Sequence, residues 1–305
     1  MDPVFASNLP RRDIDEIALT RTLARLAAAP SPWLHREVAR RMAERLPVIL
    51  RTPTSVLQWW GHLGASDEVL ARAYPKARRV SVEPDMALAQ ASRGGEPWWS
   101  PRRWRGAVPA PVAEADVPPG SAQLLWSNMT LHGVADPPAL FARWRRALAD
   151  DGFLMFSTLG PGTLAELRAL YRDAGWPAPA AEFVDMHDLG DMLVEAGFAD
   201  PVMDQERLQL AWADADAALA ELRTLGANVD PRRTAGLRTP RWRQRLRDAL
   251  HARRDEQGRL VLGFEIVYGH GFNAPPRAKV SARTEVALDD FRAMARRRPA
   301  APGRV

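Results

Sequence analysis

The chain has 305 residues, 46% of them hydrophobic and 26% charged, enough to bury the core of one large domain or of a domain with an insertion. It contains no cysteine, which excludes a disulfide framework, a thiolate nucleophile and a cysteine-based zinc site. Its six histidines show no metal-ligand spacing. No apolar run reaches the length of a membrane span, and residues 1–12 lack the apolar core of a signal peptide. We therefore expect a cytoplasmic globular protein without a metal site.

The formal net charge of +5 comes largely from arginine. Arginines cluster within residues 232–233, 241–247 and 253–254, and again in the Pro/Ala-rich tail, which we expect to be disordered. Two interpretations stay open: arginine is simply the surface cation of this chain, or these clusters bind an acidic partner. The sequence has no RNP, helix-turn-helix or zinc-finger pattern, so nucleic acid is not an expected partner.

Two helices are predicted before the first strand. The first covers residues 12–28, and Pro30-Ser31-Pro32 interrupts it. In the second, apolar residues recur every four positions, which indicates one buried stripe on a basic background. That stripe consists of Trp33 or Leu34, Val38, Met42 and Leu46.

Strands then alternate with helices. The predicted strands cover residues 54–60, 80–83, 107–110, 123–127, 153–158, 201–212 and 259–268. The predicted helices cover residues 67–74, a segment around 141–148 that Asp150-Asp151-Gly152 ends, residues 186–196 and most of 213–254. The stretch 94–119 is rich in Trp, Pro and Arg and is expected to be an irregular surface excursion. The alternation predicts a doubly wound, mostly parallel seven-stranded sheet of the α/β class with a helical insertion.

Polar residues end two of the predicted strands. Ser127-Asn128 closes one of them, and Ser157-Thr158-Leu159-Gly160-Pro161-Gly162 leads the next strand into a loop. In doubly wound sheets ligands bind at the carboxyl ends of the strands. We therefore expect Asn128 and the loop at Gly160 to lie at the mouth of a site.

The segments 56–64 and 80–83 resemble the first two strands of class I S-adenosylmethionine-dependent methyltransferases, and Ser127 to His132 resembles their fourth-strand loop. The more specific segments are similar to malonyl-acyl-carrier-protein O-methyltransferases of biotin synthesis, the BioC family. These segments are 156–167, 183–188, 196–204, 225–228 and 265–270. The resemblance covers residues 34–272 and implies a Rossmann-like fold, S-adenosylmethionine as cofactor and acyl carrier protein as partner.

The first loop departs from the family pattern. The aspartate that usually ends the first strand falls at Gln58, and the first two glycines of the GxGxG loop fall at Trp60 and His62, so that only Gly64 is kept. Those glycines let the backbone approach the cofactor closely. We expect Trp60 and His62 to narrow the site or to force a different loop, with Gly61 as partial compensation.

The resemblance also implies which residues form the site. The expected cofactor-binding residues are Trp60, Gly61, His62, Gly64, Glu83 and Asn128, with the Glu83 carboxylate accepting hydrogen bonds from the ribose hydroxyls. His132 and Tyr268 are candidates for substrate contact. Ordinary roles stay open for each of them: Glu83 as a helix cap, Asn128 as a turn residue, the tryptophans as packing residues. No residue is assigned to catalysis.

The implied reaction requires little acid–base chemistry. A carboxylate is already ionised at neutral pH, so its methylation needs positioning in a dry pocket rather than a general base. An arginine is expected to hold the malonyl carboxylate, although the sequence does not indicate which one. The alternative is a methyltransferase-fold protein with a degenerate cofactor site and a binding or regulatory role.

The predicted organisation has five parts along the chain. They are an N-terminal helical segment (1–50), a Rossmann-like methyltransferase core (51–212), a helical lid insertion (213–258), the last core strand with a C-terminal extension (259–290) and a basic tail (291–305). The arginines of the insertion are expected to bind the acidic carrier protein.

Overall fold

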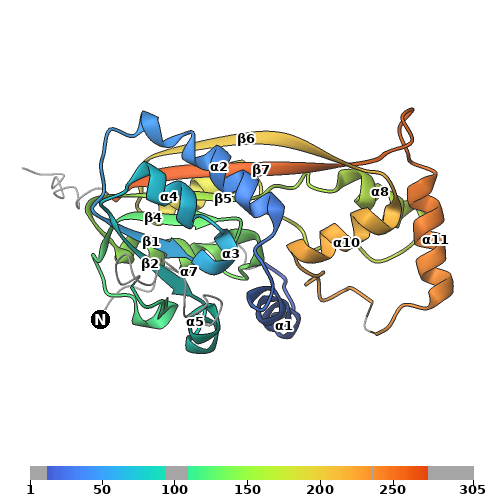
Figure 1. The fold of residues 1–305 in the computed structure, drawn as a ribbon, viewed down its shortest axis with the longest axis horizontal. Helices are drawn as coiled ribbons and strands as arrows, with labels where there is room; N and C mark the ends of the chain where they lie inside the picture. Colours follow the sequence, from blue (N-terminus) through green and yellow to red (C-terminus); the bar gives the residue numbers. More distant parts are fainter. Residues whose placement is uncertain (1–11, 94–108, 235, 274–305) are drawn as a thin grey trace, which may run out of the picture. The chain divides into compact units, whose positions relative to one another are not determined.

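A seven-stranded sheet forms the centre of the computed structural model, which describes residues 12–93, 109–234 and 236–273. The strands are β1 (Ser55–Trp59), β2 (Arg78–Glu83), β3 (Val112–Ala113), β4 (Ala122–Asn128), β5 (Leu148–Leu159), β6 (Ala199–Trp212) and β7 (Leu260–Phe272). Their order is β3-β2-β1-β4-β5-β7-β6, and only β7 runs antiparallel to its neighbours (Figure 1). The predicted mostly parallel, doubly wound sheet is confirmed.

The helices follow the strands as a doubly wound fold requires. Those before and within the first half of the sheet are α1 (Glu16–Ala27), α2 (Trp33–Ala43), α3 (Gly61–Gly64), α4 (Asp67–Ala73) and α5 (Met86–Arg93). Those that follow are α7 (Pro137–Ala147), α8 (Ala165–Asp173), α9 (Met186–Glu195), α10 (Ala215–Leu225) and α11 (Pro240–His251). Short 3-10 helices lie at η1 (Leu46–Val48), η2 (Glu114–Asp116) and η3 (Leu131–Gly133).

Helices cover both faces of the sheet (Figure 1). On one face, apolar residues of β1, β4, β5 and β7 pack against α2, α4, α8, α10 and α11. The opposite face packs against α7 and α9. Trp144 of α7 contacts Trp59 and Phe156 edge-on or tilted, with ring centroids 6.2 and 6.0 Å apart. The predicted stripe of α2 is confirmed, since Leu34, Val38 and Met42 are all buried.

Two predicted boundaries are wrong. The predicted strand 107–110 has no strand at its described residues 109 and 110. The strand in this part of the chain, β3, begins at Val112 and pairs with the carboxyl end of β2 (Val82 with Val112, Glu83 with Ala113). Residues 107 and 108 lie outside the described residues. The helix around Phe141 ends at Ala147, so Asp150-Asp151-Gly152 does not end it but lies within β5. Asp151 has φ of 61° and its N–H donates to the carbonyl of Asn273, 3.0 Å away.

The segment between β6 and β7 is helical only in part. It contains α10 and α11, while residues 226–239 between them carry no helix where the structure describes them. Helix α1 bonds to this segment: the Arg25 guanidinium donates to the carbonyls of Arg223 and Gly226, and Arg233 pairs with Asp15 at 2.7 Å. Over the described ranges, no helix has both the length and the apolar composition needed to cross a membrane.

Candidate functional site

The chain makes a sharp turn where β1 ends. Trp60 has φ of 52° and ψ of 50°, the left-handed region that favours glycine, and its N–H donates to the carbonyl of Val82 at 2.6 Å. The single helical turn α3 starts at the next residue. A Cβ on Gly61 would lie 2.4 Å from Oγ of Ser81, so only glycine fits against β2 there. Gly61 thus lets the altered loop lie against its neighbouring strand.

Gln58, in the position of the family's aspartate, is bound to the start of α4. Its amide nitrogen donates to Asp67 at 2.6 Å, and its buried Oε1 has no hydrogen-bond partner within the described residues. This side chain therefore organises the loop after β1 from inside the protein.

Glu83 ends β2 and is 4% exposed. One carboxylate oxygen accepts hydrogen bonds from the backbone N–H of His62 at 3.0 Å and from the hydroxyl of Ser81 at 2.6 Å. Burial raises the pKa of Glu83, and these two donors oppose that shift. A cavity of about 20 Å³, here called the small cavity, lies beside it and is lined by Trp60, His62 and Glu83 among others.

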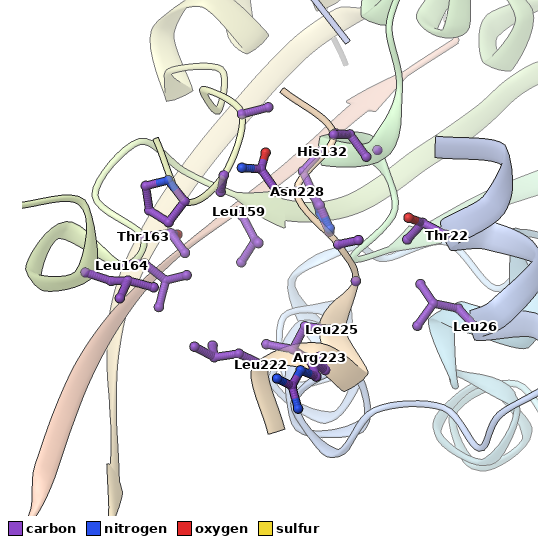
Figure 2. Close-up of a pocket in the computed structure, with 18 of the residues that line it drawn as sticks. Thr22, Leu26, His132, Leu159, Thr163, Leu164, Leu222, Arg223, Leu225 and Asn228 are labelled. Atoms are coloured by element: carbon purple, nitrogen blue, oxygen red, sulfur yellow. The ribbon is translucent and has the colours of Figure 1, made fainter. Parts of the chain in front are cut away.

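A much larger space lies at the carboxyl ends of β4 and β5 (Figure 2). This large cavity has a volume of about 420 Å³ and lies between the core, α1 and the insertion helices. Its core side includes Leu159, Thr163 and Leu164 from the end of β5 and the loop that follows. Figure 2 shows Leu222, Arg223 and Leu225 on one side of it and Thr22 and Leu26 of α1 on another.

The two cavities share part of their lining. Leu23, Leu26, Trp60 and Leu63 line both. Among these, only Trp60 carries a polar atom in its side chain. Trp60 therefore lies between the end of β2 and the large cavity.

The loop at Gly160 is fixed on β7. A Cβ on Gly160 would lie 2.3 Å from the carboxylate of Glu265, so glycine is required for this close approach. The hydroxyl of Thr163 donates to the Glu265 carbonyl and accepts from its N–H, both at 3.1 Å. Leu159, Thr163 and Leu164, which flank the Gly160-Pro161-Gly162 turn, line the large cavity, so the loop lies beside this space.

Asn128 joins three elements instead of pointing into either cavity. Its amide nitrogen donates to the carbonyls of His35 at 2.8 Å and Gly64 at 2.6 Å, and its Oδ1 accepts from the Ser157 hydroxyl at 2.7 Å. These bonds hold α2, α3 and β5 together at the carboxyl edge of the sheet. Gly61 and Gly64 likewise line neither cavity.

The two candidates for substrate contact lie in different places. His132 lines the large cavity, and burial lowers its pKa to about 3, helped by the nearby His35 and Arg12. Tyr268 of β7 lines neither cavity. Its hydroxyl donates to Glu206, and the Arg45 guanidinium lies 3.8 Å from its ring centroid. The structure therefore does not bring Tyr268 together with His132.

Arginines line the large cavity. Arg247 pairs with Asp216 at 2.7 Å, and Arg25 binds backbone carbonyls. Arg223 and Arg243 are exposed, and neither guanidinium pairs with a carboxylate in the ranges that the structure describes. These two cations are free to bind an anionic ligand.

Sequence reasoning missed the residues that surround Trp60. The indole N–H groups of Trp59 and Trp60 both donate to one oxygen of Glu114, at 3.0 and 2.6 Å, and Arg143 pairs with the other oxygen at 2.9 Å. We call these four residues the Glu114 cluster. Glu114 lies 54 positions from Trp60, in the segment expected to be irregular, so no local pattern indicated the contact.

The space beside Glu83 that the described residues enclose is small. The small cavity holds about one water molecule, whereas cavities that bind small molecules have volumes of about 300 Å³ or more. Glu83 and Trp60 both border the small cavity, and a role of Glu83 in binding the ribose stays a prediction.

Solved structures share the fold, and a family model defines the class of protein. The YcgJ protein of Bacillus subtilis matches with a TM-score of 0.51 at 10% identity, over 79% of this chain and 99% of its own. A Bacillus halodurans protein described as a methyltransferase matches with a TM-score of 0.51 at 11% identity, over 77% and 99%. At such low identity these matches show the fold alone. The family model described as a methyltransferase domain matches residues 34–200.

Sequence relatives define the family more narrowly. A malonyl-acyl-carrier-protein O-methyltransferase of Gallionella capsiferriformans is 38% identical over 87% of this chain and 93% of its own length. Relatives of the same name from Laribacter hongkongensis and Halorhodospira halophila are 36% and 37% identical, each over 90% of its own length. The chain belongs to this methyltransferase family.

Proposed function

We propose that this chain methylates the carboxylate of a malonyl group carried by acyl carrier protein, with S-adenosylmethionine as the methyl donor. The names of its relatives support this reaction, since their matches cover 87% and 88% of this chain. The sequence resemblance connects the same reaction to biotin synthesis.

The large cavity is the observation that carries the proposal. An acyl group on a phosphopantetheine arm requires a deep site that opens near the protein surface. The cavity of about 420 Å³ lies at the carboxyl ends of β4 and β5, where doubly wound folds bind ligands. Its lining is mostly apolar, with a few polar side chains such as Thr22, Thr163 and Asn228.

The residues around this cavity suit a substrate that needs no general base. The malonyl carboxylate is ionised at neutral pH, so it can act directly as the nucleophile. His132 stays neutral there because burial lowers its pKa to about 3. Arg223 and Arg243 are the proposed partners of the carboxylate, since charge-assisted bonds to guanidinium groups fix both its position and its orientation.

We further propose that α10 and α11 act as the lid and that exposed arginines of α11 bind the carrier protein. Arg241, Arg243 and Arg245 are exposed on this helix. A cluster of like charge attracts a partner of opposite charge over several ångströms and speeds their association. An acidic carrier protein satisfies that requirement.

A second function has one observation in its favour. If Trp60 never leaves its place beside Glu83, the chain is a degenerate methyltransferase that binds an acyl carrier through the large cavity and has a regulatory role. The indole of Trp60 is the feature that favours this alternative. The two functions predict different results in one assay.

The assay combines the purified chain, malonyl-acyl carrier protein and S-adenosylmethionine, with mass spectrometry to detect the methyl ester. Turnover on the order of 1 per second is an ordinary enzyme rate and would support the methyltransferase. Acetyl-acyl carrier protein is the control, because it lacks the carboxylate and should not be methylated. Binding of malonyl-acyl carrier protein without any methyl ester would support the alternative.

A further inference from the structure

The position of Trp60 is unusual for a large side chain. Its backbone lies in the left-handed region, with φ of 52°, where a Cβ is unfavourable. Its side chain is nevertheless 6% exposed and lies against Gly133, with a ring carbon 3.5 Å from where a Cβ would stand on that glycine. Interactions elsewhere must therefore hold the indole in place.

The Glu114 cluster supplies these interactions. The Trp60 indole donates to Glu114 at 2.6 Å, a short hydrogen bond to a carboxylate that is 10% exposed. Arg143 on α7 neutralises the same carboxylate from its other oxygen. Hydrogen bonds with a charged partner are stronger than neutral ones, particularly where water is excluded. The cluster thus fixes the ring between the small cavity and the large cavity.

The same residue borders the space beside Glu83. In the sheet, Ala113 of β3 pairs with Glu83 of β2, so Glu114 comes directly after the residue that lies beside Glu83. Trp60 lines the small cavity together with Glu83, and that cavity of about 20 Å³ is too small for a nucleoside. The large cavity, in contrast, is present without any movement of Trp60.

We infer that Trp60 closes the nucleoside half of the donor site, and that S-adenosylmethionine binds only to molecules in which the Trp60 indole has left Glu114. This inference rests on the proposed function only in naming the donor. We call molecules open when the indole has left Glu114. The observed affinity for the donor then equals the affinity of an open molecule multiplied by the fraction of molecules that are open. If fewer than one molecule in about ten is open, removal of the ring strengthens binding at least tenfold.

Calorimetric titration with S-adenosylhomocysteine tests the inference without any methyl acceptor. The variant Trp60→Gly removes the ring at a backbone position that favours glycine, and Trp60→Ala removes it without adding backbone freedom. We expect both variants to bind at least tenfold more tightly than the wild type. Circular dichroism melts establish that each protein is folded.

Trp212→Ala is the matched control. Trp212 is also a buried tryptophan whose indole donates to a glutamate, Glu221, at 2.9 Å, but it lines neither cavity. Removal of Trp212 should leave the affinity for S-adenosylhomocysteine within about twofold of the wild type. A general effect of lost packing would instead change the affinity alike in the Trp212 and Trp60 variants.

Two outcomes would overturn the inference. Wild type that binds as tightly as Trp60→Gly and Trp60→Ala would show that the ring does not obstruct the donor. Absence of binding in all three proteins would show that something other than Trp60 closes the site. Failure of the proposed function would give a different result. The protein would bind both S-adenosylhomocysteine and malonyl-acyl carrier protein but form no methyl ester.

Discussion

The two halves of the proposed site lie along one sheet edge but differ in the space that they leave. At the ends of β4 and β5 the chain leaves a cavity of about 420 Å³, while at the end of β2 it leaves about 20 Å³. The backbone plan is the same for both halves, since each lies where a parallel strand meets its following loop. Side chains, with Trp60 among them, border the small space at the end of β2. A shared architecture therefore positions a site without deciding which ligand can enter it.

The halves also differ in their ionisable groups. The large cavity is bordered by His35 and His132, whose pKa values burial lowers to about 4 and about 3. The end of β2 holds Glu83, and the neighbouring Glu114 cluster holds a second carboxylate. Burial raises the pKa of both. Acidification should therefore act on the two halves with opposite sign.

The largest expected effect is on stability between pH 7 and pH 5. An unfolded histidine gains a proton below about pH 6.5, whereas buried His35 and His132 stay neutral, so the free energy of unfolding falls as the pH drops. Each should contribute roughly 2 kcal/mol of loss at pH 5. Urea unfolding at both pH values measures this loss, and His132→Asn should remove about half of it.

His251→Asn is the control for that experiment, because His251 is exposed and its side chain has no ion pair among the described residues. It should leave the difference between the two pH values unchanged. An unchanged difference in His132→Asn as well would contradict the neutral, buried state of His132.

A change that fills the large cavity should have the next largest effect. Leu222 of α10 lines this cavity, and Leu222→Trp adds bulk where the acyl arm is proposed to lie (Figure 2). We expect kcat/KM for malonyl-acyl carrier protein to fall on the order of 100-fold, or about 3 kcal/mol in the transition-state barrier. Steady-state kinetics measure it. Val194→Trp, at an exposed position of α9, should change kcat/KM little, and full activity of Leu222→Trp would place the acceptor elsewhere.

The role of Glu83 becomes measurable once the small cavity is opened. In the Trp60→Gly background, Glu83→Ala should weaken binding of S-adenosylhomocysteine by about 1–3 kcal/mol, the range for a lost hydrogen bond to a charged group. Calorimetry gives the value directly. Glu68→Ala, at an exposed residue of α4, is the control. Equal affinity with and without the Glu83 carboxylate would remove Glu83 from the proposed site.

The smallest effect concerns the arginines of the large cavity. Because Arg223 and Arg243 are exposed, loss of either charge should raise KM for malonyl-acyl carrier protein by about 3–10-fold, roughly 1 kcal/mol, with kcat retained. The variants are Arg223→Gln and Arg243→Gln. Arg146→Gln on α7 is the matched control, since Arg146 is exposed, lies outside the proposed carrier-binding helix and lines neither cavity. Equal KM values for all three variants would mean that neither arginine holds the carboxylate.

Much of the fold could be predicted because buried parallel strands appear as apolar runs and amphipathic helices show a period of 3.6. The strand after Phe153 and the stripe of α2 gave clear signals of these kinds. Two short features did not: β3 has only two residues, and the start of β5 carries polar Asp150 and Asp151 beside a positive φ. In both places hydrogen bonds to a neighbouring strand form a strand where the local sequence does not predict one.

The position of Glu83 at the carboxyl end of β2 was predictable, because one residue ends one strand. Contacts that join distant segments were not predictable. Glu114 meets Trp60 only because β3 lies beside β2, and the sequence near Glu114 shows no periodicity. Asn128 was expected at the mouth of the site on the basis of its strand, but its amide atoms bond to α2, α3 and β5, which no spacing rule reveals.

The most direct test of the contrast between the two halves is a pair of calorimetric titrations on the wild-type protein, one with malonyl-pantetheine and one with S-adenosylhomocysteine. The account predicts that malonyl-pantetheine binds without the second ligand, because the large cavity is already present. It predicts that S-adenosylhomocysteine binds at least tenfold more weakly than it does to Trp60→Gly. Wild-type protein that binds S-adenosylhomocysteine as tightly as this variant, but does not bind malonyl-pantetheine, would contradict it.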